Sequence, residues 1–558
     1  MKKIKVGFLI DGLKVNSYVY DLIQHVDKSN FFLAPVLIHG HHVKKSKYQQ
    51  IRFLLNKLGF IKFINRLLII LLSKLIKRIE ISSALKSYPL YLENTFLNKS
   101  TDYKNILVNG KWSNSMVYLD FTEADIDLLR DEKFDCIVRC GSGILTGKVL
   151  NIPKYGVLSF HHGDNRINRG GPSGFWEVFL DQPSSGFVIQ KLNEELDGGN
   201  ILYRGNIMTS WNWTLNNSQL LEKSNFFLKK ILENIAETGR LPDFEDPRLH
   251  GEKLLKLDTP KILLSYLFFK LGPTVSKMII KKYISRKVIR WSVAYSKHND
   301  FSKSLWRYKE INNPPGRFLA DPFVFKYNKK TVIFVEDYSY SDKKGRISVY
   351  DISNNSEKFE GVILEEDYHL SFPFVFEDNG IVFMIPETNH INEIRMYECL
   401  DFPKKWKFKK TLMSNVDASD TVMIERDGLW YMLTNICSSG INDHNSELHI
   451  FYSDDILTDE WRPIDCGNPV IFDCQSARNG GIFYKNNELY RINQIQGKSH
   501  YGKSFGVNKV LTLNPFKYSE VRVGNIDSNH KSNIFCTHHY SANSEFAAVD
   551  FARITSKS

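Results

Sequence analysis

GVLSFHHGDNRINRGGPSGFWEVFLDQPSSGFVIQKLNEELDGGNIL, residues 156–202, is the stretch that decides the fold of the first half of the chain. Its apolar run, 157–160, predicts a buried strand that ends on two histidines, and a basic, glycine-rich loop follows. We expect a short helix around Trp176 and another strand over 186–192. The stretch closes on Asp197 in a glycine-flanked turn. A histidine at a strand end and an aspartate in such a turn can form an imidazole–carboxylate pair, so we expect the chemistry here.

The residues before this stretch alternate between strand and helix patterns. Residues 4–10 predict an apolar strand, apolar positions at Tyr18, Leu22 and Val26 predict a helix, and 32–38 predict a second strand. This opening is typical of a doubly wound parallel sheet. No GxGxxG follows the first strand, so a dinucleotide fingerprint is absent. Further strands are expected over 105–120 and 134–140, and a helix over 220–241. We therefore assign residues 1–245 to an α/β domain.

A repeat of about fifty residues marks the second half. From about Trp291 the pattern changes to short alternating strands separated by Asp, Asn and Gly turns. The repeated motif occurs as ADPFVF at 320–325, SFPFVF at 371–376, SDTVM at 419–423, ARNGGIF at 477–483 and CTHH at 536–539. Several strands per repeat at this period are typical of a propeller. The sequence predicts an all-β, five-bladed propeller over residues 293–558.

Positive charge is concentrated in two segments between or within these domains. The chain has 558 residues, too many for one core, and a formal charge of +12. Residues 41–86 hold eleven Lys or Arg and one acid, and residues 261–290 hold eight and no acid, which leaves the remainder at 12 − 18 = −6. We interpret about 43–87 as a basic amphipathic helical insertion and 246–292 as a basic helical connector broken at Gly272-Pro273.

These two segments raise the question of a membrane. Residues 51–79 and 261–290 have the composition of helices that lie in a membrane surface, and the same pattern fits helices packed on their own domain with solvated lysines. Charge confined to two segments argues against a nucleic-acid partner. Seven scattered cysteines indicate a reducing compartment, and they form no metal-ligand pattern, so we expect no metal site. We expect a cytoplasmic protein at the inner face of the cell membrane; the sequence does not give its oligomeric state.

Three motifs in the first half resemble the folate-dependent formyltransferase family, which includes methionyl-tRNA, glycinamide ribonucleotide and sugar-nucleotide formyltransferases. They are Ser159-Phe160-His161, Arg169-Gly170 and Leu196-Asp197-Gly198-Gly199. The resemblance covers about residues 1–240 and implies transfer of a formyl group from 10-formyltetrahydrofolate to an amine. It implies that a protonated His161 donates to the oxyanion and that Asp197 orients it and accepts the amine proton through a water.

The resemblance also implies where cofactor and substrate bind. Residues 141–145 are similar to the family's cofactor loop, so Gly143, Ile144 and Leu145, with Gly198, would contact the folate. Substrate contacts would come from Asp164, Arg166 and Arg169 in a polar loop that suits a phosphorylated or sugar substrate. Ser159 would be the third catalytic residue. The family has Asn in its place, and the loss of one oxyanion donor costs about 10²–10³ in rate. The domain could therefore have left formyl transfer.

The second half resembles the glycoside-hydrolase-like five-bladed propeller of plant glucosamine inositolphosphorylceramide transferases and related bacterial proteins. The motifs that carry this are Asp321-Pro322-Phe323, Pro386-Glu387, Ser419-Asp420, Ala477-Arg478 with Gly480-Gly481, Leu489-Tyr490-Arg491 and His538. The resemblance implies that Asp321, Glu387, Asp420 and Arg478 face a central pocket and bind sugar. The other interpretation is that these motifs are turns and strand ends that stabilise the repeat.

Together these features lead to one leading hypothesis for function and two alternatives. We expect a formyltransferase-like enzyme of cell-surface polysaccharide or glycolipid biosynthesis, whose partner is a nucleotide amino sugar or a glycan. The first alternative is a glycosyltransferase that uses the propeller and a repurposed first domain. The second is a non-catalytic, membrane-docked scaffold for glycan binding.

Overall fold

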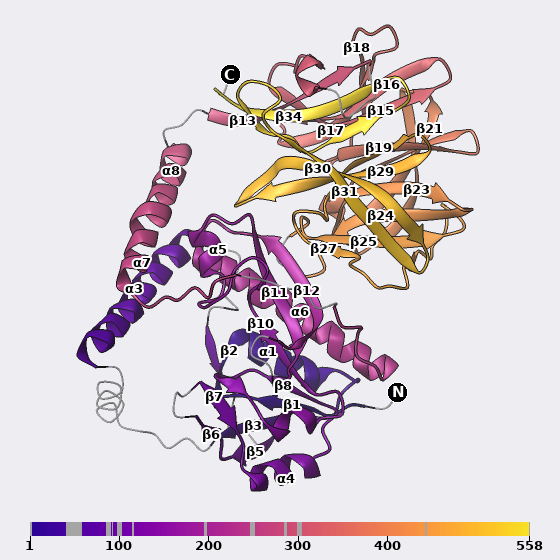
Figure 1. The fold of residues 1–558 in the computed structure, drawn as a ribbon. Coiled ribbons are helices and arrows are strands. Elements are labelled where there is room, and N and C mark those ends of the chain that lie inside the picture. Colours follow the sequence, from indigo (N-terminus) through magenta and orange to yellow (C-terminus); the bar gives the residue numbers. More distant parts are fainter. Residues whose placement is uncertain are drawn as a thin grey trace. The chain divides into compact units, whose positions relative to one another are not determined.

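A computed structural model describes residues 3–40, 59–84, 91, 93–97, 103–113, 117–194, 198–245, 252–283, 287–297, 304–440 and 443–556 (Figure 1). The chain divides into two units, Met1–Lys277 (unit 1) and Met278–Ser558 (unit 2). Each unit is described by itself below. The sequence-based boundaries at 245 and 293 bracket this division.

Unit 1 alternates strands and helices. Its elements are β1 (Val6–Leu9), β2 (Lys14–Asn16), α1 (Ser17–Lys28), β3 (Val36–Gly40), α3 (Phe60–Ala84), β4 (Asn94–Phe96), β5 (Lys104–Val108), β6 (Lys111–Trp112), β7 (Tyr118–Asp120), α4 (Glu123–Asp131), β8 (Cys136–Arg139), β9 (Ile144–Leu145), the 3₁₀ helix η2 (Lys148–Asn151), β10 (Val157–His161), α5 (Phe175–Phe179), β11 (Ser184–Lys191), β12 (Asn200–Met208), α6 (Trp213–Thr238), α7 (Pro260–Tyr266), the π-helical η3 (Leu267–Leu271) and α8 (Gly272–Tyr283).

One seven-stranded sheet organises unit 1. Its order is β12-β11-β10-β8-β1-β3-β5, in which β10, β8, β1, β3 and β5 run parallel, while β11 pairs antiparallel with β10 and β12 pairs antiparallel with β11. The α/β sheet expected from the sequence is therefore present. Strand order reverses between β1 and β8, and a crevice opens at the carboxyl ends of strands at such a point. His161 ends β10, next to β8 on the same edge.

Helix α6 starts earlier than the sequence pattern indicates. The apolar periodicity predicts a start near 220, but the helix begins at Trp213, because the Asn212 side chain accepts a hydrogen bond from the Leu215 amide at 2.7 Å. Gly239, in a left-handed conformation, ends it. Buried Leu228 and Ile231 lie on the face that packs against the sheet. α6 thus covers the strands that carry the stretch 156–202.

The two basic segments form packed helices. Of the insertion expected over 43–87, residues 43–58 and 85–87 lie outside the described residues, and α3 occupies the part between. The break expected at Gly272-Pro273 is absent, because the chain widens into the π-helical η3 and continues into α8. There the Thr274 hydroxyl donates to the Lys270 carbonyl at 2.7 Å. The connector was expected to be helical to 292, but residues 287–292 belong to a strand.

Unit 2 contains five antiparallel sheets. The first sheet contains β14 (Lys309–Glu310), β13 (Lys287–Ser296), β34 (Ala547–Ser556) and β32 (Ile534–Cys536), with β33 (Tyr540–Ala542) paired to β34. The second sheet contains β15 (Arg317–Tyr327), β16 (Lys330–Ser339), β17 (Lys344–Asp351) and β18 (Lys358–Leu364), and the third contains β19 (Ser371–Asp378), β20 (Ile381–Glu387), β21 (Glu393–Asp401) and β22 (Lys405–Ser414). The fourth sheet contains β23 (Ala418–Arg426), β24 (Leu429–Ile436), β25 (Glu447–Ser453) and β26 (Arg462–Pro463), with β27 (Ile471–Phe472) paired to β25, and the fifth contains β28 (Asn479–Lys485), β29 (Glu488–Gly497), β30 (His500–Asn514) and β31 (Lys517–Asp527). Short 3₁₀ helices lie at Leu305–Arg307 (η4) and Asn389–Ile391 (η5).

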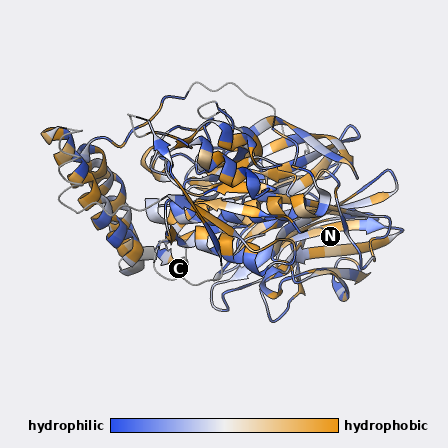
Figure 2. Ribbon diagram, turned by 90° about the horizontal axis from the view of Figure 1, so that it is seen from below, coloured by the Kyte–Doolittle hydropathy of each residue, from blue (hydrophilic) through white to orange (hydrophobic). Residues whose placement is uncertain are grey.

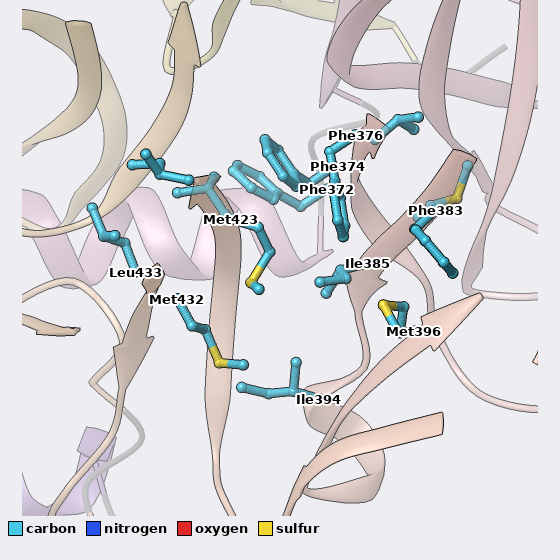
Figure 3. Close-up of a cluster of buried hydrophobic side chains, with 14 of the residues drawn as sticks. Phe372, Phe374, Phe376, Phe383, Ile385, Ile394, Met396, Met423, Met432 and Leu433 are labelled. Atoms are coloured by element: carbon cyan, nitrogen blue, oxygen red, sulfur yellow. The ribbon is translucent and has the colours of Figure 1, made fainter. Parts of the chain in front are cut away.

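Consecutive sheets pack through their first strands. β15 contacts β19, β19 contacts β23 and β23 contacts β28, while β33 contacts both β28 and β15. Apolar side chains fill the space between sheets: Met423 of β23 and Met432 of β24 point toward Ile385 of β20 and Ile394 of β21 (Figure 3). The repeat read from the sequence therefore corresponds to one sheet per repeat.

A β-bulge recurs in the first strand of four sheets. Pairing with the second strand shifts register between Ala320 and Phe323, and at the same place in β19, β23 and β28. Asp321 and Asp420, with φ of +48° and +52°, occupy this bulge in β15 and β23. In β28 the residue at this position of the bulge is Gly480. The alignment of the repeats in the sequence had placed Arg478 opposite Asp321, which is two residues too early. Left-handed backbone is strained for a non-glycine residue and is often retained where it orients a functional side chain.

Candidate functional site

His161 stands at the carboxyl end of β10 and lines a cavity of about 300 Å³. Its Nε2 lies 3.1 Å from the Oδ1 of Asn165. Gly163 allows the close turn beside the ring, because a Cβ there would lie 3.3 Å from the His161 Nε2. His162, Asn168 and Glu177 also line the cavity. The cavity thus combines two imidazoles with amides and a carboxyl group.

His162 is held by its surroundings. Its ring stacks on Phe160 at 5.3 Å between centroids and meets Tyr18 edge-on at 5.7 Å. Its Nε2 lies 3.0 Å from the hydroxyl of Ser224 on α6. Burial, followed by the neighbouring His161, lowers the pKa of His162 to about 3, so the ring is neutral. A neutral ring whose Nε2 already has a hydrogen-bond partner supports the architecture of the site.

Asp164 is satisfied inside the protein. The side chain is 1% exposed, and its carboxylate is 2.8 Å from Arg166 Nη2 and 2.6 Å from Arg204 Nη1. Burial opposes ionisation, but the hydrogen bonds from Arg166 and the charge of Arg204 hold the pKa of Asp164 below its usual value. Asp164, Arg166 and Arg169 are not among the described residues that line the cavity around His161. The ion pairs fix the loop that follows His161.

The remaining residues of the formyltransferase motifs lie as follows. Ser159 is buried, and its hydroxyl donates to the Phe160 carbonyl at 3.2 Å. Arg169 accepts a backbone hydrogen bond from Leu255 at 2.7 Å. Gly170, with φ of +116°, is needed here, because a Cβ would lie 2.0 Å from the Leu255 carbonyl oxygen. Asp197 lies outside the described residues, and the Gly198 carbonyl accepts from Asn193 at 2.7 Å.

A second cavity of about 450 Å³ lies at the carboxyl ends of β1, β3, β5 and β8. Its lining includes Asp11, Trp112 and Arg139. Asp11 accepts from the Ser142 amide at 2.8 Å and so fixes the loop predicted to hold the cofactor. Gly143 of that loop lies against the Trp112 ring, because a Cβ there would come within 2.5 Å of the ring.

The other two predicted cofactor residues are part of the fold. Ile144 and Leu145 form β9 and pair with β7, and Leu145 is buried in the core. The crevice therefore offers an aromatic face, a carboxylate and a guanidinium beside the predicted loop. These groups fit a flat ring that forms hydrogen bonds at its edge, such as a pterin.

Unit 2 contains a buried cluster of charged side chains at the bulges. Asp420 Oδ2 lies 2.6 Å from Arg478 Nε and accepts from Gln494 Nε2 at 3.0 Å. Arg478 Nη2 also lies 3.9 Å from Glu387 Oε2, and its guanidinium stacks over Tyr501 at 4.9 Å. The structure thus brings together three of the four residues that the sequence predicted for this pocket.

Asp321, the fourth predicted residue, adjoins a histidine–aspartate pair. His538 Nδ1 lies 2.6 Å from Asp550 Oδ2, and His538 Nε2 lies 3.8 Å from Asp321 Oδ1. One ligand atom from each of these three buried residues lies within 4.8 Å of the others, so they could hold a metal ion. The sequence analysis expected no metal site. The ring of Trp291 stacks on His538 at 4.2 Å.

Burial sets the proton affinity of this cluster. It raises the pKa of Asp321 to about 7, against the attraction of His538, and it raises the pKa of Asp420 to about 7, against that of Arg478. Burial, reinforced by Asp321 and Glu387, also raises the pKa of Glu336 well above its usual value. Asp550 has the opposite shift, since its bond to His538 lowers the pKa of that carboxyl. Carboxylic acids that titrate near neutral pH can act as acids or bases.

Sequence reasoning missed Glu336, Asp550 and Tyr501 in this cluster. Glu336 and Asp550 end the apolar segments VIFVE and FAAVD, 15 residues after Asp321 and 12 residues after His538 of the repeated motif. A polar residue that closes an apolar segment after the motif was the available signal. Tyr501 follows no comparable pattern.

Comparison with known proteins gives different relatives for the two halves. The model of the N-terminal region of glucosamine inositolphosphorylceramide transferase 1 matches residues 307–542. Glucosamine inositolphosphorylceramide transferase 1 of Arabidopsis thaliana is 33% identical over 214 residues, which are 38% of this chain and 28% of that protein. The chain therefore spans about a quarter of the length of that relative. Methionyl-tRNA formyltransferase of Clostridium beijerinckii is 22% identical over 249 residues, 43% of this chain and 77% of that protein.

Among solved structures, the catalytic domain of the Coprinopsis cinerea GH62 α-L-arabinofuranosidase superposes with a TM-score of 0.33 and 12% identity, covering 48% of this chain and 98% of that domain. The second half is thus similar to one named transferase, and the first half is distantly similar to another.

Proposed function

We propose that this chain is a transferase of glycan or glycolipid assembly, in which unit 1 transfers a formyl group from 10-formyltetrahydrofolate to the amino group of a sugar. The observation that carries the proposal is the position of His161, at the end of a central strand and in a cavity on the carboxyl edge of the sheet. The crevice between β1 and β8 opens on the same edge and would hold the pterin beside Trp112 and Asp11. Similarity to methionyl-tRNA formyltransferase over the first half supports the same chemistry.

The reaction needs two things from the protein. The amine nitrogen attacks the formyl carbon, a C–N bond forms, and the carbonyl oxygen becomes an oxyanion. The bond from that carbon to N10 then breaks, the amine loses a proton, and N10 gains one. His161 would donate its proton to the oxyanion, and the carboxamide of Asn165, 3.1 Å from Nε2, orients the ring for this. Asp197 would take the amine proton through a water, as the formyltransferase motif implies.

Unit 2 would bind the sugar as a five-bladed propeller. Five sheets in sequence order and a closing contact between β33 and β15 support this architecture. The bulges direct Asp321 and Asp420 to one buried cluster with Arg478, and such a combination of acceptors and donors suits sugar hydroxyls. Tyr501 offers an aromatic face of the kind that packs on a sugar ring.

The test uses the full chain, 10-formyltetrahydrofolate and a panel of nucleotide amino sugars. We expect release of tetrahydrofolate with one of these sugars, and His161→Gln to lower kcat by about 10²–10⁴. His390→Gln, at an exposed position in unit 2, is the matched control and should leave the rate unchanged. Absence of folate turnover with every sugar, together with absence of folate binding, would refute formyl transfer.

A glycosyltransferase reaction is the second candidate. The favouring observation is the pair of buried carboxyl groups, Asp321 and Asp420, whose pKa values lie near 7. Similarity of this half to glucosamine inositolphosphorylceramide transferase 1 points the same way. Sugar-nucleotide cleavage that Asp321→Ala abolishes and His161→Ala leaves intact would establish this reaction in place of formyl transfer.

A further inference from the structure

Two helices that are far apart in the sequence form one exposed apolar surface on unit 1. α3 and α7 pack side by side (Figure 1), and α8 continues from α7 through η3. We call α3 with α7–η3–α8 the helix pair. It lies away from the cavity at His161, and neither candidate reaction uses it. Figure 2 shows hydrophobic stretches along these helices, at the left of the view, interrupted by hydrophilic residues.

The inner face of the helix pair belongs to the protein core. Ile76 of α3 and Leu263, Tyr266 and Leu271 of the second helix are at most 1% exposed and pack with Phe175 of α5. Glu80, the one acid of α3, is buried as well and accepts hydrogen bonds from the Tyr266 hydroxyl, the Thr214 hydroxyl and two backbone amides. These contacts fix the helices to the start of α6. The helix pair is therefore a rigid element whose outer face needs its own explanation.

The outer face is apolar over its full length. On α3 the exposed apolar residues recur at intervals of three and four, which places them along one side of the helix. They are Phe60, Ile61, Ile64, Leu67, Leu68, Leu71 and Leu75, exposed by 36–75%, while Ile70, 44% exposed, lies off this side. The second helix adds Leu264, Phe268 and Phe269 within unit 1, exposed by 40–76%. Phe269 alone is 76% exposed. A contiguous apolar area of this kind marks an interaction site.

Charge identifies the partner. α3 carries five basic residues, Lys62, Arg66, Lys74, Lys77 and Arg78, and residues 260–283 carry five lysines and no acid. The acid of α3 is buried, so the exposed charge of the helix is entirely positive. Apolar side chains flanked by Lys and Arg fit an anionic bilayer, where the apolar groups enter the acyl boundary and the cations meet the headgroups. A protein partner would need an equally long acidic and apolar face.

The burial of the inner face of the helix pair determines whether these helices can cross a bilayer or lie on its surface. Residues Pro260–Lys281 are long and apolar enough to cross a membrane by length and composition. Crossing would pull Leu263, Tyr266 and Leu271 out of the core and break the Tyr266–Glu80 hydrogen bond. The four lysines between 261 and 281 would also enter the hydrocarbon, at a high cost. We propose that the helix pair lies flat on an anionic membrane surface and docks the protein there without spanning.

The experiment is vesicle co-sedimentation of the full chain. We expect binding to vesicles of phosphatidylcholine with about one third phosphatidylglycerol, and at least tenfold weaker binding to phosphatidylcholine alone or in high salt. Each basic residue near an anionic surface contributes roughly fivefold in partitioning. The charge variant K62Q/R66Q/K74Q should therefore weaken binding by more than tenfold. The apolar variant F268S/F269S should do the same, because both side chains are exposed and their removal leaves the core intact.

Matched controls distinguish binding through the helix pair from non-specific hydrophobic binding to vesicles. L511S/F516S removes two apolar side chains of unit 2 that are 54% and 70% exposed, and it should bind vesicles as the wild type does. Alkaline carbonate should release the bound protein, as expected for surface docking. Equal binding of F268S/F269S and wild type, resistance to carbonate, or a change in oligomeric state without vesicle binding would each overturn the proposal. Folate turnover in detergent-free buffer reports the proposed activity separately.

Discussion

Arg478→Met tests the charge balance of the unit 2 cluster. Arg478 is 13% exposed and holds Asp420, which is 4% exposed, at 2.6 Å. Methionine fills similar volume without charge, so the change leaves a buried carboxyl group that has lost its cation. Breaking a buried pair in this way costs about 3–5 kcal/mol. For a unit of this size we expect the melting temperature to fall by roughly 6–15 °C.

The cost should depend on pH, and its sign follows from proton binding. Burial already raises the pKa of Asp420 to about 7, and loss of Arg478 raises that pKa further. The folded variant therefore holds a proton over a wider range than the folded wild type. A raised pKa in the folded state means that stability is present at low pH and is lost as pH rises through that pKa. The extra loss begins above pH 7 and reaches at most about 1.4 kcal/mol per pH unit.

Thermal unfolding at pH 6 and pH 9 measures this difference. We expect the variant to lose about 2 kcal/mol more than the wild type between these two values. Arg426→Met is the control, since Arg426 pairs with Asp427 at 3.8 Å on the exposed surface, and such a pair contributes under about 1 kcal/mol. A cost for Arg478→Met that is equal at both pH values would refute the reasoning.

Three further predictions concern the frame of unit 1. Gly170→Ala should lower the free energy of unfolding by at least about 3 kcal/mol, because the new Cβ would overlap the Leu255 carbonyl, whereas Gly171→Ala meets no atom within 4 Å and should be tolerated in the same urea titration. Glu80→Ala should cost roughly 2–5 kcal/mol by thermal unfolding, since it leaves the Thr214 amide at the start of α6 and the Thr214 and Tyr266 hydroxyls without their shared acceptor, and a cost under 1 kcal/mol would contradict this. Asn212→Ala removes the cap of α6 and should cost about 0.5–2 kcal/mol in unfolding free energy, while an unchanged value would show that the cap is dispensable.

The sequence predicted best those helices and strands whose apolar residues recur at a regular spacing. The strand over 157–160 follows from an apolar run between turns, and β10 spans Val157–His161. The helical break at Gly272-Pro273 was wrong, because proline removes only one amide and a π-helical turn accommodates it. The start of α6 was missed, because the cap at Asn212 lies before the apolar period begins. The spacing of apolar residues predicts the middle of a helix, whereas side-chain contacts such as caps determine where the helix begins and ends.

Residue pairing across the fold was harder to predict than the elements. The sequence predicted an imidazole–carboxylate pair for His161 from chain spacing, and the structure places Asn165, four residues on, at its Nε2. Asp164 was expected to bind substrate because of its place in a polar loop. In the structure it pairs with Arg204, which lies forty residues further along the chain on β12. Spacing indicates which residues share an edge of a sheet. Which of them become ion pairs depends on contacts between side chains from separate elements.

The two units differ in how their buried carboxyl groups are compensated by neighbouring groups. In unit 1 the buried acids have partners: Asp164 pairs with two arginines, and Glu80 accepts from four donors. In unit 2 burial raises the pKa values of Asp321, Glu336 and Asp420, and neighbouring carboxyl groups add to each shift. An excess of buried acceptors can be relieved by protons, by a cation, or by the hydroxyl donors of a sugar. A ligand that supplies donors therefore gains affinity in unit 2 from a deficit that the fold itself leaves open.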